Sequence, residues 1–459
     1  MSVKIPRSTS IDDNLRTMTL NLKEKFNYFS RNLFVRNVAV LQVGSFAGTL
    51  VQALAGVFLA RMLQPELFGV YSLAFGLASL GGLLLGAGTQ EAVATLLGSA
   101  YTRQNGEEVK EALAFLIKLT LYAGLATMVV LLLFPMIANY FYGNPMIGWY
   151  AGIVVLGVFL SSSFSAVVQL ALQVAGRIKI LTSIIFSDQF LRFVIALILV
   201  FLGLGVLGAV MGQFIGAAII FIISLFVWER LRRQYSIFPS LRGLVGNIGT
   251  VSVRKYFGFS FWVAVDRNIG NLYMALPVVL TGIYVSAGEV SFFKLAFGFV
   301  NLALSLLGPI SMLLNIEFPK MRIEDSSKLV RNFMKVSVYG ILLSSGLTLA
   351  AVITAPFVFK ILYGESFASG ISYVFGLFIY GALYGVGIGL GPMWRAINKV
   401  KVSIIINLII LGIGIPLGLL LIKSFGLWGS VIMVTLMFTV SHFISFFYLS
   451  RKLKELPKN

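Results

Sequence analysis

Two ionisable residues and an amide interrupt one of the apolar stretches of this chain. Asp266, Arg267 and Asn271 lie within the otherwise hydrophobic residues 257–283. At about 1.5 Å per residue, Asp266 lies roughly 13 Å inside the helix that this stretch predicts. A charge at the centre of a membrane helix costs about 2.5–3.5 kcal/mol, so such residues usually face a wet cavity, a partner or a substrate. The planar donors of Arg267 suit an oxyanion, and Asp266 then balances its charge or couples transport to an ion or proton.

Helical geometry separates these residues into two stripes. Neighbours in a helix point about 100° apart, so Asp266 and Arg267 do not simply neutralise each other. A polar wedge this wide is expected to face protein or a wet cavity rather than lipid. One stripe holds Arg267, Asn271 and Met274, and the other holds Asp266, Gly270, Tyr273 and Pro277.

A second polar stripe is predicted in the first apolar stretch. Gln42, Ser45, Thr49 and Gln52 recur there at steps of three and four residues. Such spacing places side chains on one helical face. Together with the stripes of residues 257–283, this face is expected to line a central cleft. The alternative is that these residues join helices by hydrogen bonds.

Three further residues complete the predicted cavity set. Lys294 lies one turn inside an apolar stretch and either contacts a ligand or extends toward the membrane surface. Asn301 lies in the middle of the same stretch, and Arg61 lies at the end of the first one.

Asp188 and Arg192 have the i,i+4 spacing of a local ion pair. His442 lies among aromatic residues and is expected to pack rather than to bind a ligand.

The composition is that of a polytopic membrane protein. Hydrophobic residues make up 58% of the chain and charged residues 12%, whereas soluble domains carry about 25% charged residues. The mean hydropathy is +0.93. The predicted fold is therefore all-α, with about 12 membrane-spanning helices. They are expected at residues 38–60, 67–88, 112–138, 149–172, 184–202, 206–228, 257–283, 290–314, 334–359, 371–392, 402–422 and 428–449.

The second half of the chain resembles the first half at a shift of about 221 or 222 residues. Short landmarks recur in order at this spacing, which predicts two six-helix lobes formed by a parallel internal repeat. The matching landmarks are Pro135 with Pro356, Tyr142-Gly143 with Tyr363-Gly364, Ala74-Phe75-Gly76 with Ala296-Phe297-Gly298, Gly176 to Ile180 with Asn398 to Val402, and Gly205 to Gly208 with Gly426 to Gly429. The lobes are expected at 37–228 and 257–450, joined by a basic linker at 229–256 and flanked by segments 1–36 and 451–459.

Positive charges predict the orientation. In the predicted topology, 31 of the 36 Lys and Arg residues lie on one side of the membrane. Positive loops remain inside the cell, so both termini are expected to be cytoplasmic. The net charge of +19 is explained by anionic lipid headgroups, and nucleic acid is not an expected partner. Segment 1–36 is basic and reads either as a helix lying on the inner leaflet or as a disordered tail. The stripe for such a helix is Leu15, Met18, Leu22, Phe26, Phe29 and Leu33.

Enzymatic and metal sites are not expected. The chain has no cysteine and a single histidine, which argues against disulfides and against thiolate or histidine-cluster metal sites. All the predicted outward loops are short, so a polytopic glycosyltransferase with an external catalytic site is disfavoured. Neither a cofactor nor a metal is predicted.

Residues 59–72 resemble a known family signature. They read Leu59-Ala60-Arg61-Met62-Leu63-Gln64-Pro65-Glu66-Leu67-Phe68-Gly69-Val70-Tyr71-Ser72. This is similar to the turn after the first helix in the polysaccharide-biosynthesis branch of the multidrug/oligosaccharidyl-lipid/polysaccharide exporter superfamily. The same residues also suit a well-capped hairpin, because Pro65 can begin a helix and Glu66 lies at its positive end.

The resemblance implies a flippase for lipid-linked oligosaccharides in the cytoplasmic membrane. It implies two six-helix lobes around a central cavity, alternating access and a glycan on a polyprenyl-phosphate-type lipid as the substrate. Contact with other polysaccharide-assembly proteins is left open. The alternative is a cation-coupled exporter of drugs or metabolites with the same helix plan. A non-transporting membrane scaffold would not need Asp266 and Arg267 inside the bilayer.

Overall fold

The computed structural model describes residues 33–85, 89–324 and 326–455, and these residues are almost entirely helical. The segment predicted to lie on the inner leaflet falls in residues 1–32, outside the described residues. The predicted tail is described only as far as Glu455. The expected all-α architecture is therefore confirmed for the part of the chain that can be described.

The helices of the first half follow one another with short connections. Two interruptions are π-helical, at Ser161–Ser165 and Val200–Leu204. The helix bounds are α3 Leu33–Leu85, α4 Thr89–Thr102, α5 Gly106–Leu131, α6 Phe134–Tyr142, α7 Pro145–Leu160, α8 Ala166–Val174, α9 Ile178–Leu199, α10 Gly205–Gln234 and α11 Leu241–Ile248.

The second half repeats this pattern of long helices with local breaks. The helix bounds are α12 Val253–Thr281, α13 Ala287–Leu304, α14 Gly308–Glu324, α15 Ser326–Val358, α16 Gly370–Gly376, α17 Phe378–Tyr384, α18 Leu390–Ala396, α19 Val400–Phe425 and α20 Leu427–Lys454. A π-helical turn at Phe359–Tyr363 and a 3₁₀ turn at Glu365–Phe367 connect α15 to α16.

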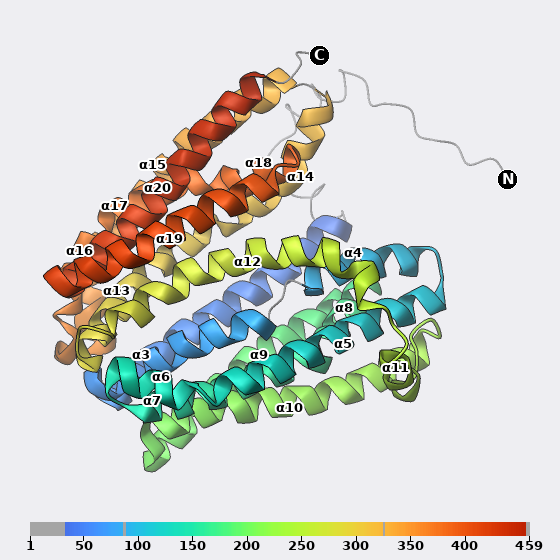
Figure 1. Cartoon of the computed structure of the whole chain (residues 1–459), viewed down its shortest axis with the longest axis horizontal. Coiled ribbons are helices and arrows are strands. Elements are labelled where there is room, and N and C mark those ends of the chain that lie inside the picture. Colours follow the sequence, from blue (N-terminus) through green and yellow to red (C-terminus); the bar gives the residue numbers. More distant parts are fainter. Residues whose placement is uncertain (1–32, 86–88, 325, 456–459) are drawn as a thin grey trace.

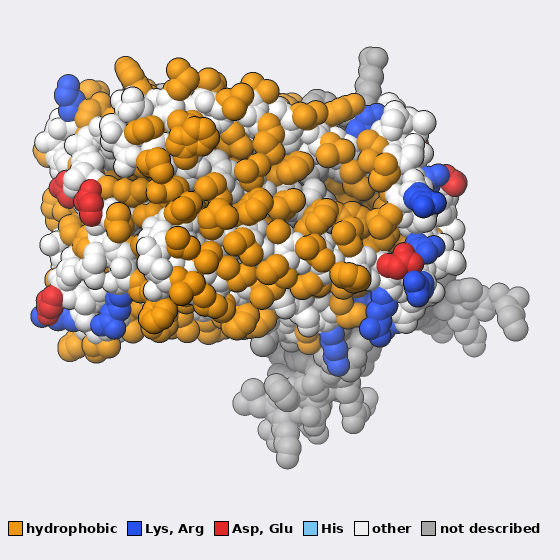
Figure 2. All heavy atoms as spheres, turned by 90° about the horizontal axis from the view of Figure 1, so that it is seen from below, with side chains coloured by type: hydrophobic (Ala, Val, Ile, Leu, Met, Phe, Trp, Pro, Cys, Tyr) orange, Lys and Arg blue, Asp and Glu red, His pale blue; other side chains and the backbone are white. Residues whose placement is uncertain are grey.

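Eight helical segments of the described chain are long and apolar enough to cross a membrane, or nine if one bent pair of helices forms a single span. Two of them are long because they contain turns: Phe46–Leu83 includes Gln64 at φ 60°, and Ile178–Gln234 includes Gly203 and Gly205, both at positive φ. Figure 2 shows hydrophobic side chains over the middle of one face, with Lys and Arg gathered mainly at one end. The protein is a multi-pass membrane protein, and the count of twelve spans stays a prediction.

The helix predicted at 67–88 is described as far as Leu85, and a further helix, α4, runs from Thr89 to Thr102. Arg103 follows the last residue of α4, and its Nη2 lies 3.1 Å from the Glu108 carboxylate at the start of α5. Glu108 lies in the first turn of that helix, where a carboxylate is favourable.

Two of the matching turns have similar backbones in the two halves, whereas Gly143 (φ 64°, ψ 13°) and Gly364 (φ 90°, ψ 171°) differ in ψ. Gly205 has φ 52° and ψ −134°, and its counterpart Gly426 has φ 55° and ψ −132°. Gly176 has φ 68°, and its counterpart Asn398 has φ 56° although it carries a side chain. Left-handed conformations at equivalent positions agree with the duplication read from the sequence. The superposition of whole lobes stays a prediction.

Helix α12 lies between two groups of helices, as Figure 1 shows. It contacts α3 and α4 on one side and α19 and α20 on the other. Asn268 of α12 donates a hydrogen bond of 2.9 Å to the Leu83 carbonyl of α3. The polar residues of α12 therefore have different neighbours on its two sides.

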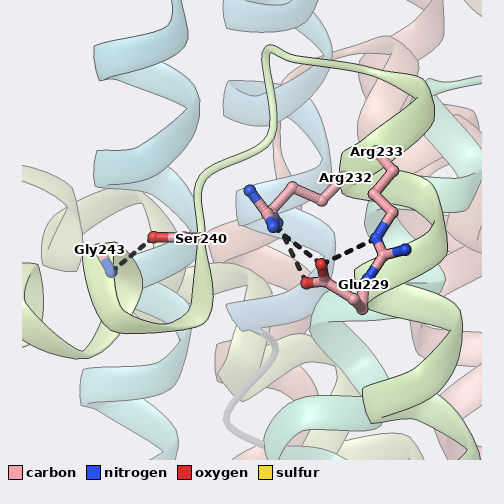
Figure 3. Close-up of polar contacts among 5 residues, drawn as sticks. All are labelled: Glu229, Arg232, Arg233, Ser240 and Gly243. Carbon is pink, nitrogen blue, oxygen red and sulfur yellow. Dashed lines mark hydrogen bonds and ion pairs between the residues drawn. The ribbon is translucent and has the colours of Figure 1, made fainter.

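The basic linker forms an ordered connection before α12. Figure 3 shows Glu229 bonded to both Arg232 and Arg233 at the end of α10. Ser240 caps α11 by accepting a hydrogen bond from the Gly243 N–H. Lys118 of α5 holds the linker in place by donating to the Gly249 and Val251 carbonyls. The lobe boundaries on either side of this linker stay a prediction.

Candidate functional site: two cavities beside α12

The first cavity has a volume of about 530 Å³ and lies between α12 and the helices of the first half. Arg267, Asn271 and Lys294 line it together. Arg267 and Asn271 are one helical turn apart on α12, whereas Lys294 comes from α13. None of the described residues that line this cavity is Asp or Glu. The charged side chains among these described lining residues are therefore both cations, which suits an anionic group.

The opposite wall contains polar residues that the sequence reasoning missed. Ser72 and Ser79 lie seven residues apart on α3, which places them two turns apart on one face. The other polar residues of this wall are Gln90, Thr120 and Ser162. Only the two serines of α3 have a spacing in the sequence that could have revealed that they share a helical face.

The predicted stripe of the first helix lies elsewhere. The side chains of Gln42 and Ser45 are outside the described residues, and Thr49 and Gln52 line neither cavity. This part of α3 packs closely on α9, where Gly48 leaves room for the Gln189 side chain. A cavity role for these four residues stays a prediction.

The second cavity has a volume of about 350 Å³ and lies on the other side of α12. Asp266, Gly270 and Tyr273 line it, so the two stripes expected from helical spacing face different cavities. Met274 lines both. Helices α14 and α17 to α20 provide the rest of the lining, which includes Tyr384, Trp394, Asn407, Phe438, Ser441 and His442.

Asp266 has a partner that the sequence did not reveal. An Arg395 guanidinium nitrogen lies 3.7 Å from its carboxylate. Arg395 also donates a hydrogen bond of 3.0 Å to Asn315 of α14. The sequence reasoning assigned Arg395 only to the positive loop after the tenth span, because nothing in the linear order relates it to α12.

Asn301 and Arg61 line neither of the two cavities. The Asn301 amide donates to the Phe297 carbonyl and accepts a 2.7 Å hydrogen bond from the Tyr380 hydroxyl. Asn301 thus joins α13 to α17. Arg61 is exposed and donates to the Ile361 carbonyl. Their predicted contact with substrate stays a prediction.

Residues 59–72 join the two halves of the chain at one end of the molecule. Glu66 accepts a 3.0 Å hydrogen bond from the Gly288 N–H at the start of α13. A Cβ on Gly69 would lie 1.7 Å from the Ala287 carbonyl oxygen, so only glycine fits there. Glu66 and Gly288 are 222 residues apart, the spacing of the repeat. Equivalent positions of the two halves therefore touch, as is expected close to a pseudo-twofold axis. We call this contact region the junction.

Two smaller predictions can be compared with the structure. Asp188 and Arg192 form the expected ion pair, with 2.7 Å between Nε and Oδ1. Arg192 also donates to Ser161 of the π-helical turn. The His442 ring packs against Phe438 and Tyr384, and it also lines the second cavity. In the described part of the chain, no group of three or more His, Asp or Glu residues is placed to hold a metal ion.

A family model described as "Polysaccharide biosynthesis protein" matches residues 34–316, which is more than half of the chain. The chain belongs to the polysaccharide biosynthesis protein family. This membership confirms the resemblance found in residues 59–72. No curated protein sequence matches the chain.

Solved structures show a related fold. An inward-facing multidrug resistance MATE family transporter of the MOP superfamily matches with a TM-score of 0.71 and 18% identity, over 89% of this chain and 95% of that one. The Vibrio cholerae MATE transporter VcmN, in a mutant form, matches with a TM-score of 0.62 and 14% identity, over 94% and 98%. The eukaryotic MATE transporter AtDTX14 has a TM-score of 0.61 and 17% identity, over 92% and 99%. These similarities show that the chain shares the fold of these transporters.

Proposed function

We propose that this protein is a flippase that moves lipid-linked oligosaccharides across the cytoplasmic membrane. The observation that favours this function is the first cavity, which both Arg267 and Lys294 line and in which no described lining residue is a carboxylate. Two cations of different geometry suit the diphosphate or phosphate that joins a glycan to a polyprenyl carrier. Arg267 binds the oxyanion through its planar donors, and Lys294 adds a second positive charge from the facing helix.

The family supports a glycan precursor as the substrate, because its members are described as polysaccharide biosynthesis proteins. The MATE-like fold supports transport by two six-helix lobes. The protein is accordingly a transporter without enzymatic activity. Its other partners are membrane lipids and the polysaccharide-assembly proteins that supply or remove the glycan.

The contacts between the two groups of helices indicate whether the structure is open to the inside or to the outside of the cell. The junction holds α3 against α13. Figure 1 shows the two groups of helices diverging toward the opposite end of the molecule. The distribution of positive charges predicts that this end is cytoplasmic. The structure therefore corresponds to an inward-open state, and the outward-open state requires the junction to separate.

A cation-coupled exporter of drugs or metabolites is the second candidate. The observation that favours it is Asp266, a carboxylate lining the second cavity, in a fold that a multidrug resistance transporter shares. Coupling would make the Asp266 carboxylate essential for export. A drug exporter would restore resistance to cationic dyes in a hypersensitive strain, whereas a dedicated glycan flippase would not.

The flippase function is tested by complementation in a strain from which the gene is deleted. Arg267→Ala should abolish surface glycan while membrane abundance stays normal, and Arg267→Lys should keep part of the activity. Arg242→Ala is the matched control, because Arg242 is an exposed arginine of α11 that lines neither cavity. Full complementation by Arg267→Ala at normal abundance would show that Arg267 does not bind the substrate.

A further inference from the structure

The second cavity has the lining of a carbohydrate site. Aromatic rings surround it, and Tyr273 and Tyr384 add hydroxyl groups to the ring surfaces. The Tyr273 and Phe438 rings meet edge to face at 5.2 Å, so the wall is rigid. A pyranose ring presents C–H groups on its faces and hydroxyl groups around its edge. Such a ring fits a cavity that combines aromatic faces with a few fixed polar groups.

One buried hydroxyl in this wall has no hydrogen-bond partner. Tyr273 is only 5% exposed, and its hydroxyl has no hydrogen-bond partner of normal geometry, because the Ser441 hydroxyl beside it donates elsewhere. The neighbouring polar groups are already paired, because Ser441 donates to the Asn407 amide oxygen and Asn407 donates to the Ser403 carbonyl. A buried polar group without a partner costs stability, so this hydroxyl is suited to bind a ligand hydroxyl.

The charges favour a neutral ligand group here. Asp266 lines the second cavity and would repel a phosphate, while Arg395 balances its charge at 3.7 Å. The first cavity has Arg267 and Lys294 instead. Met274 lines both cavities, so the two lie next to each other beside α12.

We propose that the second cavity binds the neutral sugar residue next to the phosphate of the lipid-linked glycan. This proposal rests on the flippase function proposed above. The Tyr273 hydroxyl hydrogen-bonds to a hydroxyl group of the sugar, and Tyr384, Trp394 and Phe438 contact the faces of the sugar ring. A monovalent cation at Asp266 is the competing occupant. The Arg395 contact and the absence of any cluster of three acidic or histidine ligands among the described residues make it the less favoured one.

The test compares four soluble probes on the purified full chain. One is a ten-carbon prenyl diphosphate, and the others are the same prenyl diphosphate linked to glucose, galactose or N-acetylglucosamine. The measured quantity is the ratio of affinities with and without the sugar. For the wild type we expect at least one sugar to increase the affinity about tenfold, as two or three buried hydrogen bonds would.

Three glycine variants separate the cavities. Gly270 lines the second cavity and Gly82 the first, and neither site has an atom closer than 4.0 Å to an added Cβ. Gly270→Leu should remove the sugar-dependent increase. Gly82→Leu should weaken all probes alike and keep the ratio. Gly412→Leu is the control, since Gly412 is exposed on α19, lines neither cavity and also has room.

Tyr273→Phe provides a second measurement that does not depend on filling space. It removes a hydroxyl that has no partner, so the melting temperature should stay the same or rise while the affinity ratio falls about threefold. A purely structural role for Tyr273 would give a lower melting temperature and an unchanged ratio.

The outcomes distinguish the two proposals. If the wild type does not bind the bare prenyl diphosphate, the flippase function itself fails. If it binds that probe but no sugar raises the affinity, or if Gly270→Leu keeps the increase, the sugar site is wrong. A third outcome is that probe binding depends on sodium, that Gly270→Leu abolishes this dependence and that no sugar changes the affinity. This outcome would identify a cation site in the second cavity and would overturn the proposal.

Discussion

The two cavities differ in chemistry although neighbouring residues of one helix line them. Arg267 faces the cationic cavity of the first half, and Asp266 faces the aromatic cavity of the second half. Read along the sequence, these two residues look like an ion pair. In the helix they point about 100° apart, and Asp266 pairs with Arg395 of α18 instead. One helix can therefore present opposite charges to two halves of a substrate.

The cavities also differ in what closes them. The first is lined partly by α3 and α13, the helices that meet at the junction. None of the described residues of α3 or α13 lines the second. Opening the junction should therefore change access to the first cavity more than access to the second.

The largest effect is expected from reversing the charge in the first cavity. Arg267→Glu places a carboxylate where the phosphate should bind, and two charge-assisted interactions are lost. The affinity for prenyl diphosphate should fall at least about 100-fold, measured by binding to the purified protein. Arg242→Glu on α11 should change it less than about twofold, because surface charges contribute little. An equal loss in both variants would point to net charge rather than to the cavity.

A strong effect is also expected from opening the junction. Gly69→Val cannot fit against the Ala287 carbonyl, and overpacking of this kind costs about 1–3 kcal/mol. The natural chain has no cysteine, so Ser72→Cys in the first cavity and Ser441→Cys in the second can be introduced alone. In the Gly69→Val background, an impermeant thiol reagent outside the cell should label Ser72→Cys about tenfold faster. The labelling rate of Ser441→Cys should change little. An equal increase in the labelling rates of both cysteines would show that the junction does not control access to the first cavity selectively.

Lys294→Gln should have an intermediate effect. It removes the second positive charge of the first cavity but keeps a hydrogen-bond donor, so the prenyl diphosphate affinity should fall about tenfold. If Arg267 and Lys294 hold the same anion, the loss in the double variant with Arg267→Ala will be smaller than the sum of the two single losses. If the losses of binding free energy in the two single variants add up to the loss in the double variant, Arg267 and Lys294 do not bind the same anion.

The smallest effect is expected at Asp266. Asp266→Asn keeps a hydrogen-bond acceptor, and Arg395 is 57% exposed, so water can solvate the released guanidinium. The sugar-dependent increase should fall no more than about threefold, and surface glycan should persist. Complete loss of glycan transport at normal membrane abundance would contradict this expectation and would assign ion coupling of glycan transport to Asp266.

Some of the site could be predicted because it depends on local geometry. The helical repeat alone placed Arg267 with Asn271 and Asp266 with Gly270, since both pairs lie within about one turn. The Asp188–Arg192 pair was predictable for the same reason. The membrane class followed from composition, and the duplicated turns at Gly205 and Gly426 followed from recurring sequence.

Contacts between distant segments could not be predicted. Arg395 reaches Asp266 only through the packing of α18 near α12, and Gly288 reaches Glu66 across 222 residues. The polar wall of the first cavity also includes Gln90, Thr120 and Ser162, which come from three different helical segments and are not related by any helical spacing. The stripe in the first apolar stretch had such a pattern, yet the cavities are lined without Thr49 and Gln52.

The central claim is that Arg267 binds the phosphate of a lipid-linked glycan while the protein moves that lipid between leaflets. It is tested most directly in vesicles that contain the purified protein and a polyprenyl diphosphate sugar with a fluorescent label on the sugar. An impermeant reductant destroys only the label that reaches the outer surface. We expect wild-type vesicles to lose nearly all of the fluorescence and Arg267→Ala vesicles to keep the fraction of the inner leaflet, as protein-free vesicles do. Retention of that fraction by the wild type, or its complete loss with Arg267→Ala, would contradict the claim.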